Sequence, residues 1–265
     1  MTGNFNSLEG SIMINPLKLA ILCTVMGLTA CGGSSSSSPT NSPAATTPTN
    51  TSTGSTTTTT PAPANTVTYE LTFTRTWERS NFPTNYPSGT HFSPVIGLTH
   101  NEQGRIFQRE TSASAGIASM AETGSKTLLR NEISDIQNLG NSSYLIDESG
   151  ISGSSKSVSM TFEASQSFPY LSVVSMVAPS PDWFIGIDSL LLFNDNQWVD
   201  EQTIQLKVYD AGSDSGATFS AADSPTDPQA TITLLSSERT DTDFTNGVHF
   251  TSGENIGFIK ITLMQ

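Results

Sequence analysis

The chain of 265 residues has a net charge of −13, and only 13% of its residues are charged. This balance disfavours nucleic acid as a partner, because a nucleic-acid-binding surface needs basic residues to neutralise phosphates. Its two cysteines, Cys23 and Cys31, both precede Gly32, so the rest of the chain contains no disulfide and no cysteine metal ligand.

The first predicted element is an export signal over residues 1–30. Lys18 precedes the apolar run Leu19–Leu28, which is too short to span a bilayer and is typical of a signal peptide. The run ends in Leu28-Thr29-Ala30-Cys31, which resembles the bacterial lipobox. That resemblance implies lipidation of Cys31, and Gly32 after it favours the outer membrane. The alternative is an ordinary signal peptide cleaved after Ala30.

A linker is predicted next, over residues 31–66. After Cys31 it contains almost only Gly, Ser, Thr, Pro, Ala and Asn, with no charged side chain. Such a composition buries too little apolar surface to offset the entropy of ordering, so we expect a disordered tether. As a flexible coil it would hold the following domain roughly 30–35 Å from its anchor.

Residues 67–265 are predicted to form one all-β domain. Alternation of apolar and polar residues, with some longer apolar runs, predicts short strands. These segments are Val67–Phe73, Val158–Phe162, Leu171–Val177, Trp183–Phe193, Ile204–Val208, Ile232–Leu234 and Ile259–Leu263. Helical spacing occurs only in Gly116–Glu122 and Lys126–Ile133. The expected fold is an antiparallel β-sandwich with one or two short helices.

Four stretches of this domain together resemble the spondin domain, the N-terminal module of F-spondin and mindin. They are Trp77 to His100 with Phe82-Pro83 and His91-Phe92-Ser93-Pro94-Val95-Ile96-Gly97, Ala113 to Gly124, Ser175 to Gly186 with Pro181-Asp182-Trp183-Phe184, and Val208 to Gly216 with Tyr209-Asp210-Ala211-Gly212. The last two are the most specific. The resemblance covers about Trp77–Thr226 and implies a C2-like β-sandwich that binds calcium through loops at one end. The chain lacks the cysteines of the animal family.

By this resemblance, Asp182, Asp210 and Asp214 are the calcium ligands. Calcium prefers several carboxylate and carbonyl oxygens in flexible geometry. Asp182 precedes a predicted strand, Asp210 follows the predicted strand Ile204–Tyr209, and Asp214 lies four residues further on. Spacing alone leaves a second interpretation open, in which these carboxylates only form solvated Asx-turns. Asp188 is a weaker candidate ligand.

The remaining candidate residues favour structural roles. His91, His100 and His249 match no usual zinc-ligand spacing, so we expect structural histidines. Trp77 and Trp183 are expected to anchor the core rather than to bind sugars.

No nucleophile elbow, P-loop or dinucleotide fingerprint occurs. The sequence therefore predicts a non-enzymatic, calcium-binding adhesion or interaction module on an exported, lipid-anchored protein, with an extracellular or periplasmic protein or glycan as partner. Two alternatives stay open, a carbohydrate-binding module and, least favoured, a hydrolase that uses carboxylates or the pair His91 and His100.

Overall fold

A computed structural model describes residues 65–152, 154–235, 239–244, 249 and 255–264. These residues all fall within one compact unit, Thr58–Gln265. The predicted signal peptide, Cys31 and the predicted tether as far as residue 64 lie outside the described residues.

The smaller of two packed sheets contains both the first and the last strand. Its order is β10 (Glu201–Gln205), β13 (Gly257–Leu263), β1 (Thr66–Arg75) and β5 (Ser157–Ser165). All neighbours in it are antiparallel. In β1, Tyr69, Leu71 and Phe73 are fully buried, whereas Glu70 between them is exposed and Thr72 is only partly covered. The period-two pattern therefore places one face of this sheet in the core, as predicted.

The larger sheet carries the elements that build the site. Its order is β12 (Thr233–Leu234), β11 (Lys207–Asp210), β7 (Trp183–Leu191), β6 (Tyr170–Ala178), β3 (Ile96–His100) and β4 (Ser142–Asp147), and β2 (His91–Phe92) also pairs with β6. All of these pairs are antiparallel. Strand β6 is buried along almost its whole length, which explains its continuous apolar run. A separate hairpin pairs β8 (Phe193–Asn194) with β9 (Gln197–Trp198).

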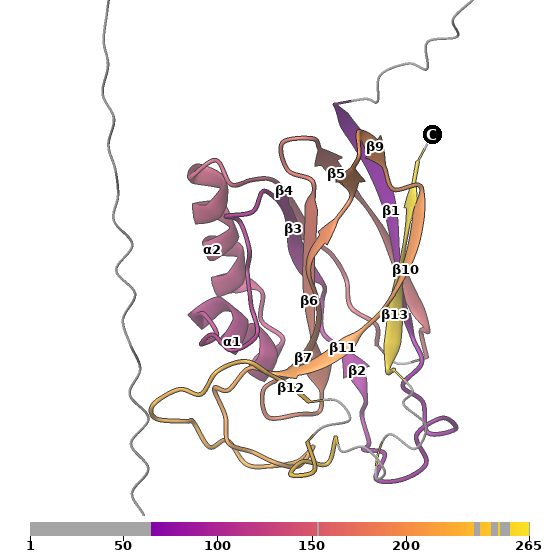
Figure 1. The fold of residues 1–265 in the computed structure, drawn as a ribbon. Helices are drawn as coiled ribbons and strands as arrows, with labels where there is room; N and C mark the ends of the chain where they lie inside the picture. Colours follow the sequence, from indigo (N-terminus) through magenta and orange to yellow (C-terminus); the bar gives the residue numbers. More distant parts are fainter. Residues whose placement is uncertain (1–64, 153, 236–238, 245–248, 250–254, 265) are drawn as a thin grey trace, which may run out of the picture. The chain divides into compact units, whose positions relative to one another are not determined.

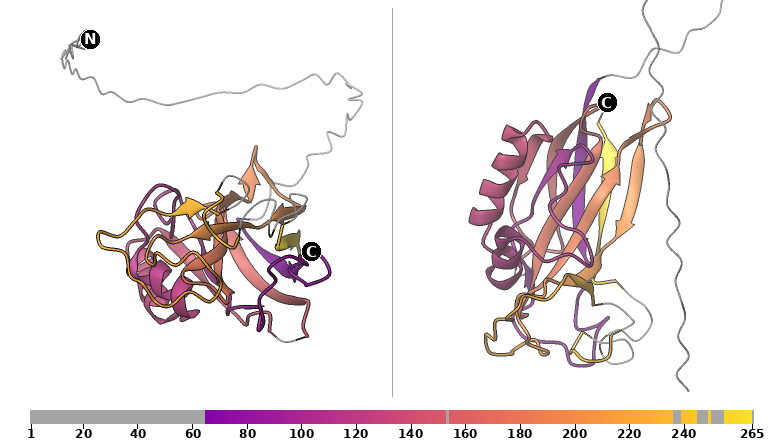
Figure 2. Two further views of the ribbon diagram at one scale, coloured as in Figure 1. Left: turned by 90° about the horizontal axis from the view of Figure 1, so that it is seen from below. Right: turned by 60° about the vertical axis from the view of Figure 1, so that its left-hand side comes forward.

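Two helices cover the outer face of the larger sheet, so this sheet is buried on both sides (Figures 1 and 2). They are α1 (Ala115–Thr123) and α2 (Thr127–Asn138), both longer than the sequence predicted. Ile117 and Met120 of α1 and Leu129 and Ile133 of α2 are fully buried in the layer between helices and sheet. A second apolar layer fills the space between the two sheets. The predicted β-sandwich with short helices is confirmed. Neither described helix is long and apolar enough to cross a membrane.

One predicted strand is wrong, because its two halves belong to different sheets. The sequence predicts a single strand through Ile204 and Val208, but the chain changes sheets between them. Strand β10 pairs with β13 in the smaller sheet, and β11 pairs with β7 in the larger one. The inner faces of both sheets line the same core, so Leu206 at the crossing stays buried and the alternation is uninterrupted.

Candidate functional site

The register between β7 and β11 brings two of the predicted aspartates together. Asp210 at the end of β11 pairs with Trp183 at the start of β7, so Asp182 lies beside the residue that follows Asp210. The backbone N–H of Ala211 donates to the carbonyl oxygen of Asp182 at 3.1 Å. The closeness of these two residues in the backbone is therefore a consequence of strand pairing, at the end of the sandwich where the loops after β11 lie beside β12 (Figure 1).

Gly212 turns the chain sharply after β11. Its φ of +72° lies in the left-handed region, and an added Cβ would lie 2.6 Å from the carbonyl oxygen of Ala230. Its N–H donates to Oδ1 of Asp210 at 2.8 Å, which closes an Asx-turn. Only glycine combines this conformation with this close approach. The turn directs the following residues back toward Asp182.

Asp182 is fully buried, and only one of its two carboxylate oxygens accepts hydrogen bonds. Its Oδ2 accepts hydrogen bonds from the backbone N–H groups of Ser213 at 2.8 Å and Asp214 at 3.0 Å, and from the hydroxyl of Ser213 at 3.3 Å. Its Oδ1 is buried without a hydrogen-bond partner. A buried carboxylate oxygen without a partner is costly, since it has lost its hydration and gained no replacement.

Asp214 organises the loop beyond the turn. Its Oδ1 accepts from the N–H of Gly216 at 2.6 Å, and its Oδ2 accepts from the N–H of Ser224 at 2.6 Å. Its side chain is buried. The carboxylate therefore holds two separate parts of the loop to each other.

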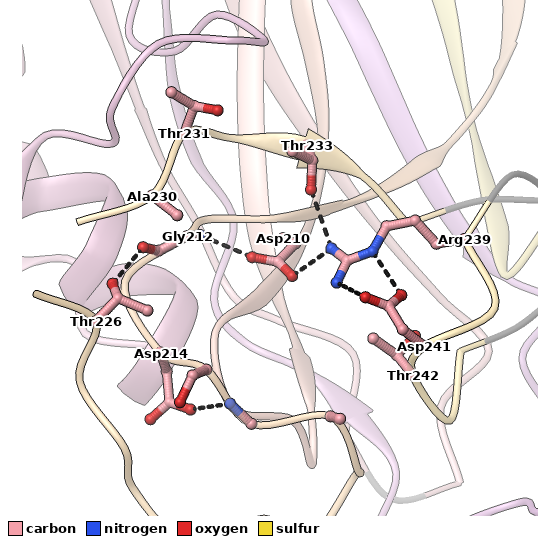
Figure 3. Close-up of a pocket in the computed structure, with 13 residues that line it drawn as sticks. Asp210, Gly212, Asp214, Thr226, Ala230, Thr231, Thr233, Arg239, Asp241 and Thr242 are labelled. Atoms are coloured by element: carbon pink, nitrogen blue, oxygen red, sulfur yellow. Dashed lines mark hydrogen bonds and ion pairs between the residues drawn. The ribbon is translucent and has the colours of Figure 1, made fainter. Parts of the chain in front are cut away.

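Arg239 belongs to the same site, although no sequence pattern predicts it there. Nη1 of Arg239 lies 2.7 Å from Oδ2 of Asp210 and also donates to the hydroxyl of Thr233 at 3.0 Å. The other side of the guanidinium makes two hydrogen bonds of 2.9 Å to the carboxylate of Asp241. The guanidinium is thus held between Asp210 and Asp241 at a pocket of about 400 Å³ (Figure 3).

The electrostatics of the site centre on Asp182. Burial, followed by the nearby charge of Asp210, raises the pKa of Asp182 to about 7, and the charge of Asp214 acts in the same direction. The hydrogen bonds from Asp214 and Ser213 oppose this rise only in part. The charges of Asp210 and Asp214 therefore both make ionisation of the Asp182 carboxyl group less favourable.

The donor set fits a hard cation such as calcium in chemistry and only partly in arrangement. All the side-chain donors are oxygens, and the unpartnered Oδ1 of Asp182 leaves one buried acceptor open. In the part of the chain that the structure describes, however, no group of three or more His, Cys, Asp or Glu side chains is arranged to hold a metal ion by itself. A bound ion would therefore need backbone oxygens as well, and shifts of Asp210 and Asp214 from their present hydrogen bonds.

Asp188, the weaker candidate ligand, has a different role. It lies on β7 and forms an ion pair with Arg105, with 3.0 Å between Nε and Oδ1. It also accepts a hydrogen bond from Ser189 at 2.8 Å. The structure therefore explains this carboxylate without a metal ion.

Two of the histidines and both candidate tryptophans are core residues. Nε2 of buried His100 is hydrogen-bonded to the hydroxyl of Ser172 at 2.8 Å, and burial lowers its pKa. Buried His249 accepts the indole N–H of Trp77 at 2.7 Å. Trp77 and Trp183 are fully buried, as predicted, so neither offers a face to a sugar. His91 is exposed.

The fold and the site define a helix-covered β-sandwich with an acidic loop site at one end. The model of the spondin N-terminal domain, Spondin_N, matches residues 67–254, and the chain belongs to this family. Human spondin-2 is 31% identical over 173 residues, which cover 64% of this chain and 52% of spondin-2. Chicken spondin-1 is 30% identical over 178 residues, or 65% of this chain and 22% of spondin-1. The matches thus span about half of spondin-2 and about a fifth of spondin-1.

Proposed function

We propose that the chain presents a non-enzymatic, calcium-binding interaction module of the spondin type at the cell envelope. The observation that carries the calcium part of the proposal is the buried, unpartnered Oδ1 of Asp182, on a carboxyl group whose ionisation is opposed by the charges of Asp210 and Asp214. A divalent cation would replace the lost hydration of this oxygen and relieve the repulsion among the carboxylates.

In this proposal Asp182, Asp210 and Asp214 hold the ion, and backbone oxygens of the adjoining loops complete its coordination. Asp182 comes from the turn before β7, whereas Asp210 and Asp214 flank the turn after β11. When bound, calcium would supply positive charge that links these two segments. The residues around the ion then define the shape of one end of the sandwich, which is where a protein or glycan partner would bind.

The envelope location rests on the N-terminal sequence. We propose export, lipidation at Cys31 with membrane anchoring through that lipid, and an outer-membrane location that follows from Gly32. The Ser/Thr/Pro-rich linker would then give the domain the reach to meet a partner away from the lipid surface. The net charge of −13 supports a protein or glycan rather than nucleic acid as that partner.

Thermal unfolding tests the calcium site. With a dissociation constant of about 0.1 mM, 2 mM calcium would stabilise the folded chain by roughly 1.8 kcal/mol, or about 4–7 °C. The shift should disappear in Asp214→Asn and persist in the matched control Asp195→Asn, which removes an exposed carboxylate in the turn between β8 and β9. No shift with calcium in the wild type, together with none for magnesium or zinc, would refute the metal site and leave the fold untouched.

Labelling tests the anchor separately. Expressed in a bacterial host, the wild-type chain should incorporate radiolabelled palmitate and partition with membranes. Cys31→Ala should lose the label, whereas Cys23→Ala should keep it because Cys23 lies inside the predicted signal peptide. Equal labelling of the wild type and Cys31→Ala would contradict the proposed anchor.

A further inference from the structure

Arg239 is in direct contact with Asp210 of the three-aspartate site, and its two ion pairs differ in their exposure to water. Its Nη1 reaches Oδ2 of Asp210 at 2.7 Å, where the Asp210 side chain is only 11% exposed. The pair of Arg239 with Asp241 is more open to water, since the Asp241 side chain is 65% exposed. Water screens an exposed pair far more than a buried one, so the contact of Arg239 with Asp210 is the less screened of the two.

Asp210 has no oxygen to spare beside this contact. Its Oδ1 accepts the N–H of Gly212 at 2.8 Å, and its Oδ2 faces Arg239. An ion that binds Asp210 must therefore share an oxygen with one of these donors, and at Oδ2 it meets the positive charge of the guanidinium. The remaining contacts of the guanidinium are to the hydroxyl of Thr233 and to both oxygens of Asp241, whose negative charge offsets part of its positive charge.

We infer that Arg239 is a built-in competitor that weakens calcium binding at Asp182, Asp210 and Asp214, and that Asp241 sets its strength by drawing the guanidinium away from Asp210. This inference rests on the calcium site proposed above. Calcium sites tune affinity through the charge of their surroundings. Arg239 cancels part of the negative charge that attracts the ion and occupies one ligand oxygen, so this site would respond to calcium at higher concentrations than its three aspartates alone would allow.

The direction of each substitution follows from charge. Arg239→Gln removes the positive charge and frees Oδ2 of Asp210. Coulomb's law for a unit charge and a divalent ion ~6 Å apart in a water-like medium gives about tenfold tighter binding. Arg239→Lys keeps the charge, so its dissociation constant should stay within about threefold of the wild type. Asp241→Asn removes a neighbouring negative charge and leaves Asp210 as the only carboxylate partner of Arg239, so binding should weaken several-fold.

The experiment is a calorimetric titration of the full chain with calcium chloride at constant ionic strength. The wild type, the two Arg239 variants and Asp241→Asn are compared with Asp195→Asn, which should change binding little. Tighter binding by Arg239→Gln but not by Arg239→Lys supports the inference. Calcium binding by Arg239→Gln but not by the wild type supports it in its strongest form.

Two results would overturn the inference and leave the calcium site standing. The first is calcium binding by Arg239→Gln that is equal to or weaker than that of the wild type, which would make Arg239 a positioning residue for Asp210. The second is unchanged or tighter calcium binding by Asp241→Asn. If circular dichroism shows that Arg239→Gln does not fold, the binding of calcium by Asp241→Asn tests the inference in its place. Binding by neither the wild type nor any variant would instead refute the proposed calcium site itself.

Discussion

The backbone N–H of Asp214 donates to Oδ2 of Asp182 at 3.0 Å, so the loop after β11 is tied to the turn before β7 by one carboxyl group. The same carboxyl group leaves Oδ1 buried and without a partner. Asp182 therefore both organises the site and carries its least favourable charge. Removing only the charge of Asp182 should therefore affect stability differently from removing its whole side chain.

We expect Asp182→Asn to stabilise the protein in EDTA at pH 8 and to abolish its response to calcium. Burial raises the pKa of Asp182 in the folded protein to about 7. The protonated carboxyl group therefore contributes to the stability of the folded state below pH ~4, and this contribution is lost as the pH rises through 7. At pH 8 the ionised group is thus destabilising, and the neutral amide should recover on the order of 1–3 kcal/mol. Urea unfolding with and without calcium measures both effects.

The control is Asp182→Ala, which removes the charge together with the acceptor of the N–H groups of Ser213 and Asp214. It should lose the calcium response and also destabilise the protein in EDTA, because those two buried donors are left without partners. If Asp182→Asn destabilises the protein at pH 8 as much as Asp182→Ala does, the charge of Asp182 is not the source of strain.

Gly212→Ala should destabilise the protein by about 3 kcal/mol, even in EDTA. Alanine pays the cost of a left-handed conformation, and its Cβ would lie 2.6 Å from the carbonyl oxygen of Ala230. Gly89 provides a matched control, since its φ is also +72° but nothing lies within 4 Å of an added Cβ. Gly89→Ala should therefore cost only about 1 kcal/mol. Equal losses in chemical unfolding of the two variants would show that the close approach at Gly212 is unimportant.

The sequence could predict the sandwich because burial repeats every second residue in the strands that face the core. It could not predict the change of sheet at Leu206, because that residue stays buried on either side of the crossing. The proximity of Asp182, Asp210 and Asp214 was expected from the family resemblance, and strand pairing between β7 and β11 supplies its physical basis. Whether they bind calcium stays a prediction.

Arg239 could not have been found from spacing. It lies 29 residues after Asp210, and its contacts depend on how the intervening loop returns past β12. Neither a periodic pattern nor a local motif relates the two residues, so only the folded loop brings them together. Thr226 is likewise brought to Gly212 only by the folded loop, and its hydroxyl donates to the carbonyl oxygen of Gly212 at 2.6 Å.

Glu132→Ala should destabilise the protein by about 1–2 kcal/mol. Glu132 on α2 accepts the hydroxyl of Ser114 at 2.6 Å and the N–H of Gly116 at 2.7 Å, so it caps the start of α1 from the neighbouring helix. Asp135→Ala, on the exposed side of α2, should change stability by less than about 0.5 kcal/mol. Urea unfolding compares them, and equal effects would contradict a capping role for Glu132.

His249→Gln should make the protein more resistant to mild acid. Burial lowers the pKa of His249 to about 4, whereas an unfolded histidine has a pKa near 6.5. Between these values the unfolded chain binds the extra proton, so the contribution of neutral His249 is present above pH ~6.5 and is lost as the pH falls toward 4. From pH 7.5 to pH 5 this amounts to about 1–2 kcal/mol.

Glutamine keeps an acceptor for the indole N–H of Trp77, 2.7 Å from His249 in the wild type, and has no titrating group. The test compares urea unfolding of the two proteins in EDTA at pH 7.5 and pH 5. The wild type should lose about 1–2 kcal/mol more than His249→Gln over this range, and the contribution of Asp182, which has the opposite sign, cancels because both proteins contain it. Identical pH dependence would mean that His249 is protonated in the folded protein, and Nε2 could not then accept from Trp77.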